Sequence, residues 1–165
     1  FCYRLPLDRK GKGPRKDCGH AKYLEKLGLL NSKYAINLEK DEFPEPVFVT
    51  AMSENHFKEG LTLIANFRKF WPQQKLYIYN LGLHKESLSR LKGMCMLELR
   101  SFPFGDYPHY VKSLMEYRWK PILIAQMLNE FGAVWYMDTS VRWKKDKRDV
   151  VYNELKCRRD GKWRP

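Results

Sequence analysis

The feature that most constrains the fold is a repeated alternation of short apolar runs with helix-like segments. The apolar runs lie at residues 47–51 (VFVTA), 75–80 (KLYIYN), 95–100 (CMLELR) and 133–137 (AVWYM). Runs of this length are typical of strands that are buried on both faces of a sheet. Because helical segments separate them, the sequence predicts an α/β fold: a mostly parallel sheet of about four strands with helices on both faces.

The helix boundaries are marked by residues that start or stop helices. The hydroxyl of Ser53 is suited to cap a helix that Pro72 would stop. Gly93 is expected to end a short helix after the second strand. A further helix should begin near Lys120 and stop at Gly132. A short helix is also expected between residues 20 and 31.

Length and charge divide the chain into a nearly neutral centre and two basic ends. The 165 residues suggest one folded domain, and their formal net charge is +12. Residues 1–20 contribute +4 and residues 142–165 contribute +6. We therefore predict a basic arm with a short helix and linker at 1–45, a folded domain at 46–145, and a basic tail at 146–165. Basic ends suit phosphate, nucleic acid or an anionic membrane surface, and equally suit a solvated tail.

The first residue and the cysteines bear on processing and compartment. The chain begins with Phe1, so we expect a fragment or a processed chain without its upstream targeting segment. Cys95 lies in an apolar stretch and is predicted to be a core thiol. A disulfide between Cys2 and Cys18 is plausible in an oxidising compartment. A zinc site made by these two cysteines and His20 matches no common spacing.

Small and polar residues follow several of the predicted strands. Ligands of open parallel α/β sheets bind at the carboxyl ends of the strands. The candidates there are Thr50, Ala51 and Ser53 after the first strand, Asn80 after the second, and Asp138, Ser140 and Arg142 after the fourth. No dinucleotide-binding, P-loop, nucleophile-elbow or HExxH motif is present in the sequence.

Each of these candidates has an alternative role. Asp138 can ligate a hard divalent cation that offsets the charge of a diphosphate, or it can cap a turn or pair with Arg142. Ser53 can serve only as a helix cap. Lys120 stands at a predicted helix start, where a phosphate can meet both amides and ammonium, but it can also be a solvated lysine. His56 can touch a ligand or lie at the surface.

Five blocks of sequence occur in an order that resembles a known family. They are VFVTAMSENHF, KLYIYNLGL, LRSFPFGDYPHYV, EYRWKPILIAQML and VWYMDTSVRW, and they cover about residues 46–145. They resemble a nematode-expanded animal family that is similar to nucleotide-diphospho-sugar transferases of the GT-A fold. The resemblance implies a glycosyltransferase that moves a sugar from a nucleotide-sugar donor to an unknown glycan, protein or lipid acceptor.

The resemblance also implies roles for the candidate residues. Thr50, Ala51 and Ser53 would line the nucleotide pocket, with Asn80 near the base or ribose. Arg118 and Lys120 would approach the diphosphate or the donor sugar. Asp138 would be the motif aspartate and a ligand of Mn²⁺ or Mg²⁺, with Ser140 and Arg142 beside it.

Two departures from the GT-A pattern qualify this expectation. The usual Asp-x-Asp motif reads Asp138-Thr139-Ser140, so metal binding would need another ligand. Few residues follow the motif, and the acceptor-binding half is expected to be missing. The resemblance implies a Golgi or secretory lumen and a membrane anchor that this chain lacks. The alternative is a non-catalytic module whose basic arms bind a polyanion or a partner; no specific nucleic-acid partner is expected.

Overall fold

The computed structural model describes residues 11, 17–31, 42 and 44–159, without the side chains of 156–159. The chain forms two compact units, residues 1–35 and 36–165. In the first unit, α1 (Ala21–Lys26) is shorter than predicted. Gly28 ends it early, because its φ of 72° is left-handed and its amide turns back to the carbonyl of Glu25 at 2.9 Å.

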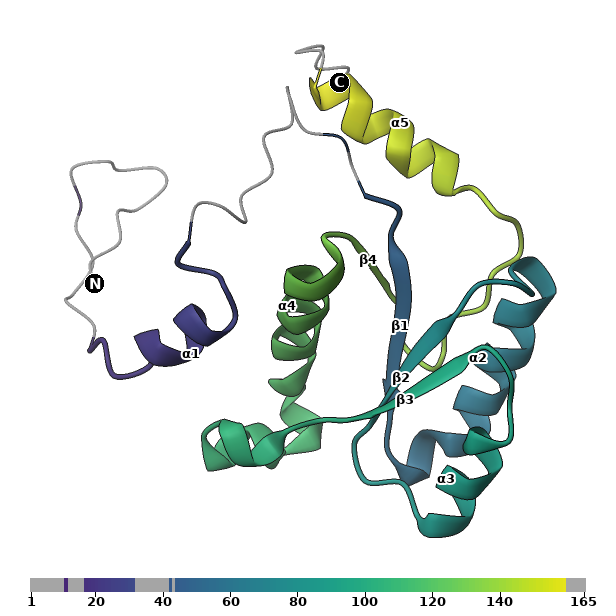
Figure 1. Ribbon diagram of the computed structural model, residues 1–165, viewed down its shortest axis with the longest axis horizontal. Helices are drawn as coiled ribbons and strands as arrows, with labels where there is room; N and C mark the ends of the chain where they lie inside the picture. Colours follow the sequence, from purple (N-terminus) through teal and green to yellow (C-terminus); the bar gives the residue numbers. More distant parts are fainter. Residues whose placement is uncertain (1–10, 12–16, 32–41, 43, 160–165) are drawn as a thin grey trace. The chain divides into compact units, whose positions relative to one another are not determined.

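The second unit contains a four-stranded parallel sheet, which confirms the predicted α/β fold (Figure 1). Its strands are β1 (Val47–Met52), β2 (Leu76–Asn80), β3 (Leu97–Ser101) and β4 (Val134–Tyr136). Their order in space is β3-β2-β1-β4. The central strand β1 is therefore hydrogen-bonded to β2 on one side and to β4 on the other.

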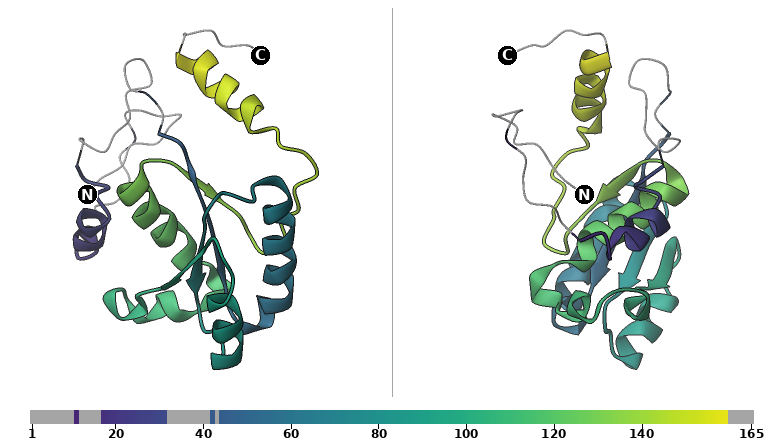
Figure 2. Two further views of the ribbon diagram at one scale, coloured as in Figure 1. Left: turned by 45° about the vertical axis from the view of Figure 1, so that its right-hand side comes forward. Right: turned by 90° about the vertical axis from the view of Figure 1, so that its left-hand side faces the viewer.

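Helices cover both faces of this sheet, as Figures 1 and 2 show. One face carries α2 (Phe57–Phe70) and α3 (Lys85–Lys92), preceded by the short 3₁₀ helix η2 (Glu54–His56). On this side Phe48, Leu63 and Ile78 belong to one buried core. The other face carries α4 (Trp119–Phe131). There the hydroxyl of Tyr79 lies 3.5 Å from the sulfur of Met127.

Two glycines fix how closely the helices approach the sheet. Gly60 of α2 leaves room for Met52, since an added Cβ would lie 2.6 Å from the methionine methyl carbon. Gly132 ends α4 as predicted, with a φ of 80°, and an added Cβ would lie 2.8 Å from Pro44. Gly132 therefore combines a left-handed backbone with tight packing, whereas Gly60 only packs closely against Met52.

The segment between β3 and α4 contains three 3₁₀ helices, η3 (Phe104–Asp106), η4 (His109–Lys112) and η5 (Leu114–Glu116). After these short turns α4 begins at Trp119, close to the start predicted near Lys120. Tyr117, directly after η5, has a left-handed backbone with a φ of 54°.

One further expectation is wrong, and one segment gains structure. Cys95 is exposed, because β3 begins only at Leu97 and the thiol lies in the turn before it. Much of the predicted basic tail is helical: α5 spans Arg148–Arg159. The indole of Trp135 donates a hydrogen bond of 3.2 Å to the hydroxyl of Tyr152 in this helix. Cys2 lies outside the described residues, and its pairing with Cys18 stays a prediction.

Candidate functional site

The order of the strands creates a switch point between β1 and β4. From β1 the chain moves outward through β2 to β3, and then returns to place β4 on the opposite side of β1. The connections on the two sides of β1 therefore leave in opposite directions. At such a point the carboxyl ends of the strands leave a crevice in which ligands of open α/β sheets bind.

A cleft of about 470 Å³ opens at this switch point. The end of β1 and the start of α2 form one wall, with Ala51, Met52, Ser53, Asn55, His56 and Glu59. The segment leading into α4 forms another, with Leu114, Met115, Tyr117, Trp119 and Lys120. Leu81 and the residues Asp138, Thr139 and Ser140, which follow β4, complete the lining. The site is thus built by segments that are up to about ninety residues apart in the sequence.

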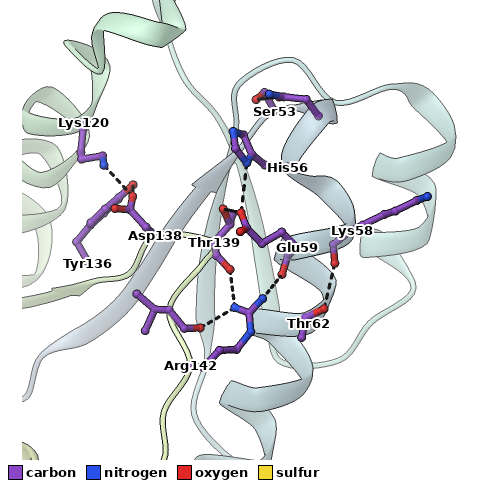
Figure 3. Close-up of polar contacts among 12 residues, drawn as sticks. Ser53, His56, Lys58, Glu59, Thr62, Lys120, Tyr136, Asp138, Thr139 and Arg142 are labelled. Atoms are coloured by element: carbon purple, nitrogen blue, oxygen red, sulfur yellow. Dashed lines mark hydrogen bonds and ion pairs between the residues drawn. The ribbon is translucent and has the colours of Figure 1, made fainter.

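An ion pair between Lys120 and Asp138 joins two of these walls (Figure 3). The Nζ of Lys120 lies 2.7 Å from Oδ1 of Asp138, and the hydroxyl of Tyr136 donates to the same oxygen at 2.9 Å. Burial, together with the adjacent Asp138 charge and hydrogen bond, raises the pKa of Tyr136 above its usual value. The tyrosine therefore remains a hydrogen-bond donor to the carboxylate.

The Lys120 ammonium also lies among aromatic rings. Its Nζ is 5.0 Å from the ring centre of Tyr117, 5.3 Å from that of Tyr136 and 5.7 Å from that of Trp119. Aromatic faces attract a cation at these distances and hold its position. The lysine side chain is 26% exposed and the Asp138 side chain is 52% exposed. The pair is therefore fixed in position yet accessible from the cleft.

A second polar group lies on the α2 side of the cleft. Oε2 of Glu59 accepts a short hydrogen bond from the hydroxyl of Thr139 and lies 3.2 Å from Nδ1 of His56 (Figure 3). The Thr139 hydrogen bond, followed by contributions from His56 and Arg142, lowers the pKa of Glu59. The carboxylate therefore stays ionised and links the loop after β4 to α2.

Five of the nine predicted donor-site residues line this cleft: Ala51, Ser53, Lys120, Asp138 and Ser140. They come from three separate segments of the chain, as expected if the carboxyl ends of the strands form one site. Ser53 makes no helix-capping hydrogen bond, and its hydroxyl instead donates to Oδ1 of Asn55 at 2.5 Å. The alternative pairing of Asp138 with Arg142 is wrong, because Asp138 pairs with Lys120.

The other four predicted residues do not line the cleft. Thr50 is fully buried in β1. Asn80 uses its side-chain oxygen to accept hydrogen bonds from the amides of Gly82 and Leu83, at 2.9 and 2.7 Å. This asparagine shapes the turn after β2. Their roles in nucleotide binding stay predictions.

The two arginines among these four are engaged elsewhere. The Nε of Arg118 lies 2.5 Å from a carboxylate oxygen of Glu116, and its guanidinium lies over the ring of Tyr110. The guanidinium of Arg142 donates to the backbone carbonyls of Thr139, Val141 and Glu59 (Figure 3). Arg142 thereby holds the loop after β4 against α2.

Several cleft residues were not selected from the sequence. Glu59 and Thr139 meet across 80 positions, and no local pattern marks such a contact. His56, for which a ligand contact and a surface position were both open, also lines the cleft. Met115 and Tyr117 also line the cleft, and neither is among the predicted site residues.

The cleft fits a divalent cation poorly. Within the ranges described above, no group of three His, Cys, Asp or Glu side chains could hold a metal ion. Asp138 offers a single carboxylate, and one of its oxygens already accepts from Lys120 and Tyr136. Hard cations such as Mg²⁺ and Mn²⁺ prefer several oxygen ligands. Lys120 instead supplies the positive charge at this point.

The fold and cleft define an open parallel α/β domain with a binding crevice at its switch point. Residues 1–125 match the model of the family described as protein of unknown function (DUF1647), and the chain belongs to this family. The match includes Tyr117 and Lys120 and ends before Asp138. No curated protein and no solved structure matches the chain. Among the helices that the structure describes, none is long and apolar enough to cross a membrane.

Proposed function

We propose that this domain binds a nucleotide-diphospho-sugar and forms the donor-binding half of a glycosyltransferase. The observation that carries the proposal is the cleft at the β1–β4 switch point, which brings the Lys120–Asp138 pair together with Ser53 and Ser140. Its volume of about 470 Å³ lies within the range of small-molecule sites. The small polar side chains offer hydrogen bonds at a strand edge, where diphosphates of nucleotides bind in open α/β sheets.

Lys120 is the residue that we expect to bind the diphosphate. An ammonium is a compact cation with three donors, and Asp138 uses one of its directions. The aromatic rings around it attract the ammonium and hold it in position for an anion, while its side chain stays 26% exposed. Because this ammonium supplies the positive charge, we expect Mn²⁺ or Mg²⁺ to add little affinity.

Asp138 would have two tasks in the proposed site. It holds the ammonium in the cleft, and its carboxylate is exposed enough to accept hydrogen bonds from sugar hydroxyls. We further propose that the protein transfers the sugar to a glycan, protein or lipid acceptor in the Golgi or secretory lumen. That part of the proposal rests on the sequence resemblance alone.

The proposal is tested by measuring binding of UDP- and GDP-sugars by calorimetry, with and without Mn²⁺. We expect Lys120→Gln to weaken binding about tenfold or more, since it removes a charged hydrogen-bond donor. Asp138→Asn should weaken it less. Added Mn²⁺ should change the affinity of the wild type by less than about twofold.

Lys75→Gln is the matched control. Lys75 also pairs with a carboxylate, that of Glu98 at 3.1 Å, and lies 5.7 Å from the ring centre of Tyr77. It does not line the cleft. This variant should bind nucleotide sugars like the wild type. If none of the nucleotide sugars binds the wild-type protein, the proposal fails.

A further inference from the structure

Tyr117 combines a strained backbone with an exposed aromatic ring at the edge of the cleft. Its φ and ψ of 54° and 17° lie in the left-handed region, which residues with a Cβ rarely adopt. Within the described residues, the other non-glycine with a positive φ is Met96. Strain of this kind persists only where the surrounding structure imposes it, and it gathers at functional sites.

Four contacts impose this conformation on Tyr117. Its amide donates to the carbonyl of Leu114 at 3.1 Å, and its own carbonyl accepts from the amide of Lys120 at 3.0 Å. The indole of Trp119 donates to the same Leu114 carbonyl at 3.2 Å. The residues on either side, Glu116 and Arg118, form an ion pair at 2.5 Å that clips the turn closed.

The strained turn at Tyr117 leaves apolar side chains of the cleft wall exposed to solvent. Tyr117 is 51% exposed and the neighbouring Met115 is 76% exposed, and both line the cleft. The ring of Tyr117 also lies 5.0 Å from the Lys120 ammonium. A flat apolar ring beside a cation suits a ligand that has an apolar face next to an anionic group.

We infer that the ring of Tyr117 is the platform on which the donor sugar stacks; this inference rests on the proposed function. The carbon-bound hydrogens of a pyranose form an apolar face, while its hydroxyls form a polar rim. In a nucleotide-diphospho-sugar, the pyranose is bonded directly to a phosphate, whereas the base is separated from the diphosphate by the ribose. A diphosphate on Lys120 therefore brings the pyranose next to Tyr117, with Asp138 available to its hydroxyls.

The test compares a nucleotide sugar with the nucleoside diphosphate from which it derives. Calorimetry would use whichever of UDP-glucose, UDP-N-acetylglucosamine and GDP-mannose binds best, together with UDP or GDP alone. Tyr117→Ala should weaken binding of the nucleotide sugar roughly tenfold and that of the nucleoside diphosphate by less than about twofold, because the rings of Tyr136 and Trp119 still lie beside the Lys120 ammonium. Tyr117→Phe keeps the ring and should bind both ligands like the wild type.

The strain provides a second readout that separates stability from binding. Tyr117→Gly should melt at a higher temperature than Tyr117→Ala, because glycine adopts the left-handed conformation readily. It should bind the nucleotide sugar as weakly as Tyr117→Ala does. Met96→Gly and Met96→Ala are the matched pair: the same order of melting temperatures is expected, with unchanged binding, since Met96 does not line the cleft.

The possible failures are distinguishable. If the wild type binds neither nucleotide sugars nor nucleoside diphosphates, the proposed function fails and this inference with it. If the wild type binds a nucleotide sugar and Tyr117→Ala binds it equally well, only the platform is wrong. An equal loss for the nucleotide sugar and the nucleoside diphosphate would instead assign the ring to the base or the ribose, which also overturns the inference.

Discussion

The two ends of the sheet carry similar groups that serve different purposes. Near the amino ends of β1 and β2, the guanidinium of Arg148 lies 5.3 Å from the ring centre of Phe48 and 4.8 Å from that of Trp71. At the carboxyl ends, the ammonium of Lys120 lies beside Asp138 and among three aromatic rings. Each cluster thus combines a cation, a carboxylate and aromatic faces.

The clusters differ in how exposed their charged groups are and in how many hydrogen bonds these groups make within the protein. The Arg148 side chain is 16% exposed, and its Nε and Nη2 donate to the carboxylate of Asp146 at 3.0 and 2.9 Å. The indole of Trp71 donates to that carboxylate as well, at 3.0 Å. Around Lys120, the partner carboxylate is half-exposed and faces the cleft. The amino-end cluster therefore stabilises the fold, whereas the carboxyl-end cluster is open to a ligand.

The largest effect that tests this contrast is expected from removing the two cations. Arg148→Ala removes a guanidinium packed on two rings and should lower the free energy of unfolding by roughly 2 kcal/mol. Lys120→Ala should lower it by less than about 1 kcal/mol, because its ion pair is partly solvated. Urea unfolding of both variants measures the difference.

Arg148→Lys is the matched control for charge. It keeps a cation near Phe48 and Trp71 but loses the planar fork that binds Asp146 through two nitrogens. An unfolding free energy between those of the wild type and Arg148→Ala is expected. Equal losses for Arg148→Ala and Lys120→Ala would contradict the contrast between the two ends.

The sequence predicted the sheet and the cleft edge because both depend on local patterns. Continuous apolar runs mark strands that are buried on both faces, and polar residues such as Ser53 and Asp138 mark where those strands end. The same continuous run hides which side chains face the cleft. In β1, nothing in the sequence VFVTA shows that Thr50 is turned away from it.

The features that the sequence did not reveal depend on distant partners. The contact of Trp71 with Asp146 spans 75 positions, so the segment from residue 146 onward looked like a basic tail. Helix α5 of this segment begins at Arg148, which is itself part of the amino-end cluster. Likewise, no glycine in the sequence marks the left-handed turn at Tyr117. Its conformation is imposed instead by contacts of Leu114, Glu116, Arg118 and Trp119.

A smaller effect is expected from Asp146, the carboxylate of the amino-end cluster. Hydrogen bonds from Arg148, and then from Trp71, lower the pKa of Asp146 to about 2. A carboxyl group whose pKa is lowered by folding stabilises the protein above its unfolded pKa of about 4. That contribution is lost as the pH falls from about 4 towards 2, because in this range the unfolded state binds a proton before the folded state does.

Asp146→Asn tests this pH dependence. The variant should be less stable than the wild type at pH 6 by about 1 kcal/mol or less, since the carboxylate is 40% exposed and solvent screens the pair. The difference should shrink below pH 4, and urea unfolding at a series of pH values measures it. A difference that stayed constant from pH 6 to pH 2 would mean that the Asp146 charge contributes nothing.

The smallest effect is expected between the two ends, at Thr50 in the middle of β1. Its side chain is fully buried, and its hydroxyl has no hydrogen-bond partner within the described part of the chain. Because a buried hydroxyl without a partner is costly, Thr50→Val should raise the free energy of unfolding by roughly 0.5 kcal/mol. It should leave nucleotide-sugar binding unchanged, since Thr50 does not line the cleft.

Val49→Thr is the reverse experiment on the neighbouring residue. Val49 is also fully buried, so a new hydroxyl there should destabilise the protein by more than Thr50→Val stabilises it. Thermal unfolding of both variants and calorimetry of nucleotide-sugar binding to Thr50→Val separate the two roles of the strand. A tenfold loss of nucleotide-sugar affinity in Thr50→Val would mean that Thr50 does belong to the donor site. It would also move the boundary between the stabilising end of the sheet and the proposed ligand-binding end into the middle of β1.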